Sequence, residues 1–279
     1  RWLVAEKRKQ TLVENQEIIK LMLELARIRY PYNQGTLGNI YKTEARLHEV
    51  QNMLSMIAGD IAETSYRLRS LMNLNDDDSI MVDTTTVVDF EPNQVIYDTA
   101  SLSDQRSDIK QMDRSIEVMR LNQQLQRVQA KPDFRIRFEH MSPRGEGMPQ
   151  QFSAMAMVTI PIAPWSSKMY KAEIKGMQYD IEAMKKGREA LLIEARGMLA
   201  GMAEKLLRME QQLSNYETKI IPALRRNQET LMLAYEENRE QLPMVVDGWE
   251  ALNMAQMVYL DKLEEYYNMI VNYEKELEK

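Results

Sequence analysis

The chain has 279 residues, a net charge of −6 and no Cys, and its 22 Met and 13 Tyr accompany only 10 Gly and 4 Phe. Few Gly beside many Glu, Gln, Leu and Ala indicate a helix-rich protein, and the acidic balance gives no support for binding to nucleic acid. The absence of Cys excludes a disulfide framework, a thiolate metal site and a thiol nucleophile.

The first part of the chain predicts two long helices joined by a turn. Residues 1–31 have helical spacing, which the stretch PYNQGTLGN interrupts with Pro31 and Gly35. Residues 39–74 predict the second helix, which ends at the turn-forming stretch NDDDS. Its apolar positions repeat at intervals of three and four residues, as in a coiled coil, with one step missing: Leu47, Val50, Leu54, Ile57, Ile61, Leu68 and Leu71.

Residues 75–103 are rich in β-branched residues and contain Pro92, which predicts an irregular or extended segment. Three consecutive carboxylates, at positions 76–78, offer oxygen ligands to a cation, although a solvated loop is the simpler interpretation. Helical pattern returns over 104–131 with Asp104 as a candidate N-cap, and Pro132 introduces an extended segment.

Two segments of about ten residues, 132–141 and 151–162, alternate apolar and polar side chains and predict an antiparallel β-hairpin. This length suits a tilted strand that crosses a bilayer, with one face toward lipid and one toward water. An amphipathic hairpin packed on a soluble core fits the alternation equally well. The apolar face comprises Phe134, Ile136, Phe138, His140, Phe152, Ala154, Ala156, Val158, Ile160 and Ile162, and the polar face comprises Asp133, Arg135, Arg137, Glu139, Met141, Gln151, Ser153, Met155, Met157 and Thr159.

The remainder of the chain predicts a second pair of long helices, over 166–237 and 242–278. Only Pro222 seriously interrupts the first of these, and we expect a kink or a restart there. The last helix repeats the heptad spacing of a coiled coil at Leu252, Tyr259, Leu263, Tyr266, Ile270, Tyr273 and Leu277. No apolar run reaches 18 residues, so a transmembrane helix is excluded.

The two helical hairpins resemble copies of each other. Tyr32 precedes Gly35 by three residues, and Tyr235 precedes Asn238 by three, and each turn leads into a heptad helix. We therefore infer an internal duplication, with a strand hairpin inserted in the second copy. The strands of the first copy would precede Arg1, so we expect this chain to be an N-terminally truncated piece of a longer protein.

Four motifs in order carry a family resemblance. The stretch AYEENREQLPMVVDGWEALNMAQMVYLDKLEEYYN resembles the periplasmic tip and returning helix of TolC-family outer-membrane efflux factors, and RYPYNQGTLGNIYKTEARL resembles the same tip in the first repeat. PDFRIRFEHM and FSAMAMVTIPIAPWSSKMYKAEI resemble the family's strand, loop, strand and helix entry. The chain departs from the family at Asn238, where Gly is usual, and at residues 39–41, where the family has Asp-Val-Leu.

The resemblance implies a mainly α fold of long antiparallel coiled-coil hairpins of the α-barrel type, with one inserted β-hairpin of a transmembrane β-barrel. The expected segments are a first helical hairpin of the periplasmic tube (1–74), an irregular equatorial segment (75–103), a helix (104–131), the outer-membrane β-hairpin (132–162) and a second long helical hairpin (163–279). Family members form homotrimers with four strands from each protomer. This chain supplies two strands and cannot close that barrel as given.

The resemblance also implies the function, which is the passive channel of a tripartite efflux system, without catalysis or a cofactor. Its partners would be outer-membrane lipid, a periplasmic adaptor (a membrane fusion protein) and an inner-membrane pump. The turns would contact the adaptor, because turns between long helices present side chains and free backbone groups at the end of the tube. The alternative function is a periplasmic coiled-coil adaptor or scaffold. The expected contact residues are Asn33, Gln34, Gly35, Thr36, Glu237, Asn238, Arg239 and Glu240.

The Met-rich character around the strand loop is most similar to the heavy-metal branch of the family, which exports copper, silver or divalent cations. Thioether sulfur is a soft ligand suited to Cu(I) and Ag(I), so the candidate metal-contacting residues are Met141, Met148, Met155 and Met157. The simpler interpretation is that Met fills helix interfaces. Glu44 and His48 share one helix face, and a surface pair is favoured there over a metal site.

Overall fold

The computed structural model describes residues 1–75, 80–83, 90, 99–129, 131–141, 151–160 and 164–277. The chain divides into two compact units. Unit 1 comprises Arg1–Gln94 and Gly201–Lys275, and unit 2 comprises Val95–Ala200 and Glu276–Lys279. One long helix, α5 (Pro164–Asn215), contributes residues to both units.

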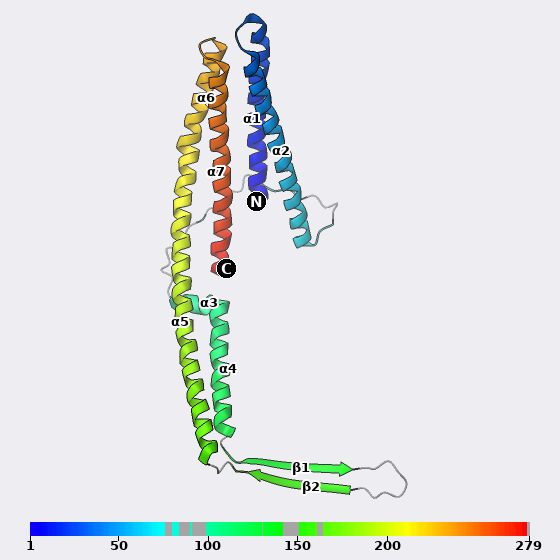
Figure 1. The fold of residues 1–279 in the computed structure, drawn as a ribbon, viewed down its shortest axis with the longest axis vertical. Coiled ribbons are helices and arrows are strands. Elements are labelled where there is room, and N and C mark those ends of the chain that lie inside the picture. Colours follow the sequence, from blue (N-terminus) through cyan, green and yellow to red (C-terminus); the bar gives the residue numbers. More distant parts are fainter. Residues whose placement is uncertain are drawn as a thin grey trace, which may run out of the picture. The chain divides into compact units, whose positions relative to one another are not determined.

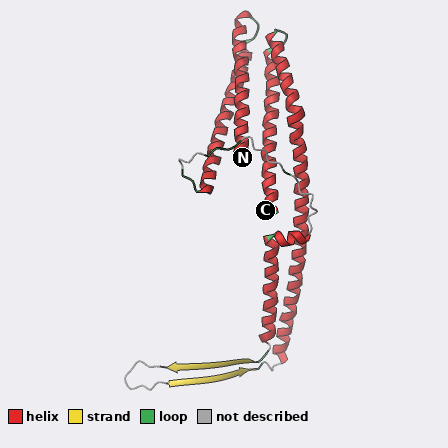
Figure 2. Ribbon diagram, turned by 180° about the vertical axis from the view of Figure 1, so that it is seen from behind, coloured by secondary structure: helices red, strands yellow, loops and turns green. Residues whose placement is uncertain are grey.

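Unit 1 consists of two helical hairpins that lie side by side with their turns at the same end (Figure 1; Figure 2 gives the view from behind). The first hairpin contains α1 (Trp2–Arg29), the short 3₁₀ turn η1 (Tyr30–Tyr32) and α2 (Leu37–Met72). The second contains the end of α5, the π-helical turn η2 (Tyr216–Ile220), α6 (Ile221–Glu236) and α7 (Leu242–Glu276).

The core of unit 1 lies between the hairpins near their turns, where all four helices contribute apolar side chains. Trp249 and Val246 of α7 are almost completely buried there. Gly248 permits a close approach of α6 to α7, because a Cβ atom at this position would lie 2.6 Å from Leu231 Cδ1. The other members of this core are Leu12, Ile19, Met22, Leu23, Ala26, Ile40, Val50, Ile57, Tyr235, Leu242 and Val245.

Polar contacts fix the pairing of the two hairpins along α7. Asn15 of α1, only 2% exposed, donates through Nδ2 to Gln256 Oε1 at 2.9 Å. Farther from the turns, Arg8 Nη2 forms ion pairs with Asp261 at 2.5 Å and with Glu264 at 3.2 Å. A buried polar pair tolerates few alternative registers, so these contacts specify how α1 aligns with α7.

Unit 2 contains α3 (Thr99–Gln105), α4 (Ser107–Gln129), the first part of α5 and a β-hairpin. Arg106, between α3 and α4, contacts Asp108 through two hydrogen bonds of 2.9 and 3.0 Å and also reaches Glu276. Arg188 of α5 donates to both carboxylate oxygens of Asp113 on α4. The buried apolar residues between these helices include Leu102, Ile109, Ile116, Ile181, Leu192, Ala195 and Leu199.

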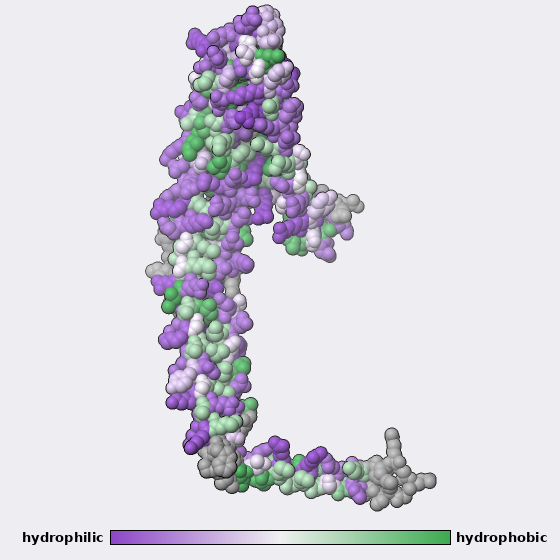
Figure 3. All heavy atoms as spheres, in the orientation of Figure 1, coloured by the Kyte–Doolittle hydropathy of each residue, from purple (hydrophilic) through white to green (hydrophobic). Residues whose placement is uncertain are grey.

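The β-hairpin pairs β1 (Asp133–Met141) with β2 (Gln151–Thr159) in antiparallel register from Asp133 opposite Thr159 to Met141 opposite Gln151. Directly opposed residues share a face, so the register collects the apolar side chains on one face and the polar ones on the other. His140 stacks on Phe152 at 4.4 Å between ring centroids on the apolar face. Figure 3 shows the hydrophobic residues gathered along one side of the hairpin.

The mainly α fold with one antiparallel hairpin is confirmed, and the five expected helices begin and end within a few residues of the expected positions. The expectation of an irregular segment up to residue 103 is wrong at its end, because α3 begins at Thr99. The expected N-cap at Asp104 is wrong, because Asp104 lies within α3; instead, Asp108 Oδ1 accepts the backbone N–H of Ile109 at the start of α4. The carboxylates at 76–78 and most of the irregular segment lie outside the described residues.

Within the described residues, no helix is both long enough and apolar enough to span a lipid bilayer.

Candidate functional site

In both hairpins of unit 1, the helix that leads into the turn ends with the same backbone motif. Asn33 and Asn238 adopt left-handed conformations, each with φ of 59°. The Asn33 N–H donates to the Tyr30 carbonyl and the Gln34 N–H to the Arg29 carbonyl, at 3.1 and 3.3 Å. Asn238 and Arg239 repeat the pattern, to Tyr235 and Ala234, at 3.0 and 2.8 Å. These are Schellman motifs, in which a left-handed residue satisfies the last carbonyls of a helix.

This geometry corrects the register of the internal repeat. The sequence pairs Gly35 with Asn238, whereas the backbone shows that Asn33 is the equivalent of Asn238 and Tyr30 the equivalent of Tyr235. Gly35 does not have a left-handed φ, and a Cβ atom there would meet no heavy atom within 4 Å. The first turn therefore has no special requirement for Gly at position 35, because Asn33 supplies the left-handed backbone conformation.

Arg29 connects the two turns. Its Nη1 donates to the Tyr235 carbonyl oxygen at 2.5 Å, and its Nη2 donates to the Glu236 carbonyl oxygen at 2.8 Å. Its guanidinium carbon also lies 4.3 Å from the centroid of the Tyr235 ring. A cation at a helix C-terminus satisfies terminal carbonyls and interacts favourably with the helix dipole. This role of Arg29 is not visible in the sequence, because only the fold brings α1 to the end of α6.

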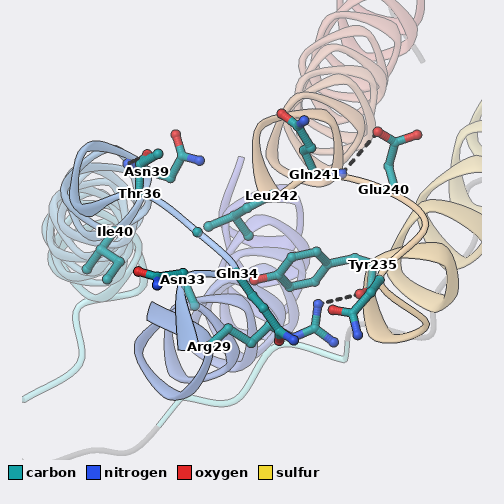
Figure 4. A pocket seen from close by; sticks show the side chains of 13 residues that line it. Arg29, Asn33, Gln34, Thr36, Asn39, Ile40, Tyr235, Glu240, Gln241 and Leu242 are labelled. Atoms are coloured by element: carbon teal, nitrogen blue, oxygen red, sulfur yellow. Dashed lines mark hydrogen bonds between the residues drawn. The ribbon is translucent and has the colours of Figure 1, made fainter. Parts of the chain in front are cut away.

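A pocket of about 450 Å³ lies between the two turns. Figure 4 shows Tyr235 projecting from α6 toward the first turn, with the Arg29 guanidinium beside it. Six of the eight expected contact residues line the pocket, while the remaining two, Glu237 and Arg239, form an exposed ion pair at 3.2 Å. The six are Asn33, Gln34, Gly35, Thr36, Asn238 and Glu240.

Polar and apolar side chains both line the pocket. Side-chain amides dominate the lining, and Glu240 is its one carboxylate among the described residues. Burial raises the pKa of the Tyr235 phenol and the nearby Arg29 lowers it, with burial the larger effect, so Tyr235 is neutral at pH 7. Thr36 caps α2 by accepting the N–H of Asn39 at 3.4 Å. The side chains that line the site can donate and accept hydrogen bonds with a partner.

Two ion pairs between α2 and α7 follow directly behind the pocket. Lys42 contacts Asp247 at 3.1 Å, and Arg46 contacts Glu250 at 2.7 Å. Hydrogen bonding to Glu49 is the main cause of a raised pKa at Arg46, which keeps this side chain charged. The pairs are partly exposed, so each contributes modestly to stability.

Two of the candidate metal-contacting methionines lie opposite basic side chains. Met155 lies opposite Arg137 and Met157 opposite Arg135, while Met141 lies opposite Gln151. Arg135 pairs with Asp133, and Arg137 pairs with Glu139. Met148 lies outside the described residues. The structure thus brings Met155 and Met157 to one face, opposite two guanidinium groups that are each paired with a carboxylate.

No group of three or more carboxylate or His side chains gathers around a metal position in the described ranges. Glu44 accepts from Arg27 at 3.0 Å, and His48 Nδ1 lies 3.0 Å from Gln51 Oε1. Glu44 and His48, which share one helix face, therefore contact different partners.

No protein-family model and no curated protein sequence matches this chain. Solved structures do. The outer-membrane channel OprN superposes with a TM-score of 0.81 at 15% identity, covering 99% of this chain and 63% of OprN. CusC, described for transmembrane channel formation, superposes with a TM-score of 0.78 at 12% identity, covering 99% of this chain and 65% of CusC.

The outer membrane protein VceC from Vibrio cholerae superposes with a TM-score of 0.78 at 14% identity, covering 99% of this chain and 67% of VceC. The chain has the fold of these channel proteins. It spans about two thirds of the length of each. The likeness extends over both units and includes the β-hairpin, because nearly the whole chain is superposed.

Proposed function

We propose that this chain is part of a TolC-family outer-membrane efflux factor, which conducts substrates passively from the periplasm to the exterior. The observation that carries the proposal is the chain-wide fold match to outer-membrane channels. A coiled-coil adaptor would account for the helical hairpins but not for a two-faced β-hairpin inserted between α4 and α5. The channel is therefore favoured over the adaptor or scaffold.

The β-hairpin supports a place in the outer membrane. Phe134, Ile136 and Phe138 share one face and are 71 to 87% exposed in this chain. Exposure of three large apolar side chains to water is unfavourable, and lipid would remove that cost. Nine-residue strands with one apolar face match the strands of membrane-spanning barrels. The hairpin would supply two strands of such a barrel.

Exposed seams on α4 and α5 support assembly into a homotrimer. Val118, Leu121, Leu125 and Val128 of α4 are each more than half exposed, at the alternating spacing of a coiled coil. Small residues recur every seven positions on an exposed face of α5, at Gly176, Ala183, Ala190 and Gly197, and the large side chains of Tyr179 and Ile193 are exposed on the same face. These two exposed faces could pack against each other between identical copies of the chain, and head-to-tail packing of that kind forms a ring when its rotation closes.

The turns would bind a periplasmic adaptor that connects the channel to an inner-membrane pump. The pocket between them is lined by several side-chain amides, and Arg29 and Tyr235, which are hydrogen-bonded to each other, also line it. Cysteines introduced at Gln34 and Glu240 should cross-link to the adaptor, while a cysteine at the exposed Glu63, farther along α2, should not. Equal cross-linking from all three positions would contradict docking at the turns.

We propose no catalytic step and no cofactor for this channel, since conduction makes and breaks no bond. The test of the function is the susceptibility of cells that lack the full-length protein. Loss of the protein should raise sensitivity to exported compounds, and the wild-type gene should restore resistance. Ile136→Arg should not restore it, whereas Ser153→Arg, which adds the same charge to the polar face, should. A full-length protein found in the soluble periplasm would overturn the proposal.

A heavy-metal cargo is the second, narrower candidate. Two thioethers on the polar face favour soft cations such as Cu(I) and Ag(I). Arg135 and Arg137 lie directly opposite these two Met side chains on the neighbouring strand. Replacing Met155 and Met157 with Leu keeps the volume and deletes the ligands. Copper or silver resistance should then fall while trimer assembly persists, and the same replacement at the exposed Met56 and Met254 should change neither. Unchanged metal resistance would exclude a role for this pair.

A further inference from the structure

The helix that leads to the second turn changes its buried face at one point. Before the π-turn, the buried positions of α5 follow a regular heptad spacing through Leu206, Met209 and Leu213, with Tyr216 half-buried at the next step. These residues pack within unit 1. Continued regular spacing would bring Ile220 and then Ala223 into the buried face of the helix.

The structure buries the neighbouring positions instead. Ile221, Leu224 and Leu231 are half-buried, and Gln228 and Tyr235 are fully buried. The positions expected from regular spacing are exposed: Ile220, Ala223, Asn227 and Thr230. The two regular stretches are therefore offset by one residue, and the offset falls between Leu213 and Ile221.

The π-turn lies within this interval. It covers Tyr216–Ile220, and the N–H of Ile221 donates to the Tyr216 carbonyl five residues earlier. A π-turn holds one more residue than an α-turn, so it adds one residue without ending the helix. One residue corresponds to a rotation of about 100° around an α-helix, which separates a buried position from an exposed one.

Two helices of the same unit provide internal comparisons. α7, which packs along this helix, keeps an unbroken heptad spacing from Val245 through Trp249, Leu263 and Tyr273. α1, which leads to the equivalent first turn, is α-helical from Trp2 to Arg29 without a π-turn. The extra residue is thus a feature of the second hairpin and not of the turn motif that both hairpins share.

We propose that η2 accommodates a single inserted residue, and that this insertion sets the rotation of α6 that places Tyr235 against Arg29. The proposal concerns the fold of unit 1 and is independent of the transport function. Without the π-turn, an α-helical connection would turn Tyr235 and Gln228 away from the core. The guanidinium of Arg29 would then lose its contact with the Tyr235 ring.

Pro222 offers a competing cause, because Pro lacks an N–H and its ring clashes with the carbonyl four residues earlier, that of Thr218. The two causes make different predictions. If the insertion is the cause, deletion of one residue in the π-turn restores continuous spacing and the protein keeps its core. If Pro222 is the cause, removal of its ring restores the α-helix and rotates α6.

The test compares three variants of the full chain: deletion of Thr218, deletion of Glu229 and Pro222→Ala. Thr218 and Glu229 are both exposed, so neither deletion removes a buried side chain. Deletion of Thr218 should leave the unfolding midpoint within a few degrees of wild type. Deletion of Glu229 rotates one side of the helix relative to the other. Either Leu224 and Gln228 or Leu231 and Tyr235 then leave the core. The unfolding midpoint should therefore fall by about 10 °C or more.

Trp249 provides the second readout. It is 2% exposed in the core beside the turns, and it becomes the only tryptophan when Trp2 and Trp165 are replaced by Phe. Its emission should be unchanged by the Thr218 deletion and by Pro222→Ala, and should shift to longer wavelength with the Glu229 deletion. A Thr218 deletion as damaging as the Glu229 deletion, or a shifted emission in Pro222→Ala, would overturn the proposal.

Discussion

Arg29 and Tyr235 join the two helical turns, although 206 positions separate them in the sequence. The guanidinium of Arg29 donates to the Tyr235 carbonyl and covers the face of its ring. The Arg29 side chain therefore caps the C-terminus of α6 and packs on the ring of Tyr235, which lines the pocket. This contact fixes the first turn against the second.

We predict that Arg29→Ala lowers the free energy of unfolding by about 2–3 kcal/mol, because it removes charged hydrogen bonds to two carbonyls and a cation–π contact. Arg29→Lys should recover only part of this loss, since an ammonium cannot reproduce the planar, two-pronged geometry. Arg27→Ala is the matched control. It removes an exposed pair with Glu44 and should change stability by less than about 1 kcal/mol. Denaturant unfolding measures all three variants, and equal losses at positions 27 and 29 would refute the special role of Arg29.

The left-handed residues at the ends of the first helices provide a second prediction. Asn238→Gly should stabilise the protein by about 0.5–1 kcal/mol, because Gly adopts positive φ without a Cβ penalty. Asn238→Val should destabilise it by about 1–2 kcal/mol. Asn33 should respond in the same direction to each substitution. Gly35→Val should have little effect on stability, because its φ is not left-handed and its surroundings are open. Thermal unfolding that showed Gly35→Val to be the most harmful would restore the sequence-based register.

The buried pair of Asn15 and Gln256 provides a third prediction. Asn15→Ala leaves Gln256, which is 8% exposed, without its partner and should cost about 1–3 kcal/mol. Replacing both residues with Leu should cost less than Asn15→Ala, because no unpaired polar group remains. A double-mutant cycle measures the coupling. Additive effects of the two single substitutions would mean that the hydrogen bond does not contribute.

Asp108 gives the fourth prediction, a dependence on pH. Its hydrogen bonds with Arg106 are the main cause of a lowered pKa, so the folded protein binds the proton less tightly than the unfolded chain. The stabilisation is complete above the unfolded pKa of about 4 and is lost as the pH falls through the lower folded value. Asp108→Asn should therefore lower stability at pH 7, and the difference from wild type should shrink below about pH 4. A difference that stays constant from pH 7 to pH 3 would contradict this role.

Periodic features were predictable from the sequence, and long-range features were not. The heptad at Leu252 through Tyr273 located α7, and alternation from Phe134 to Phe138 located β1, because each signal depends on the chain's own repeat. The face on which each side chain lies followed from the same alternation, since a shift by one residue would move every apolar side chain to the polar face. The register itself came from the structure, because a shift by two residues would keep both faces.

The details of the turns required the fold. Gly35 is the residue with the greatest freedom to adopt positive φ, yet Asn33 takes that conformation, because it lies where the last carbonyls of α1 need donors. The sequence predicted a kink or a restart at Pro222, whereas the structure has a π-turn directly before it, for which the sequence carried no signal. Arg29 gave no signal beyond a basic residue at a helix end, since its partners belong to the other hairpin.

The most direct test of the account is whether β1 crosses the outer membrane with its apolar face toward lipid. These 279 residues contain no Cys. With any Cys elsewhere in the full-length protein replaced by Ser, single cysteines at positions 134 to 139 can be labelled in cells without background from the chain itself. Environment-sensitive probes at Phe134, Ile136 and Phe138 should report lipid and be quenched by lipid-borne quenchers. Probes at Arg135, Arg137 and Glu139 should report water. Equal access of a water-soluble thiol reagent to all six positions would contradict a membrane-spanning hairpin and, with it, the channel.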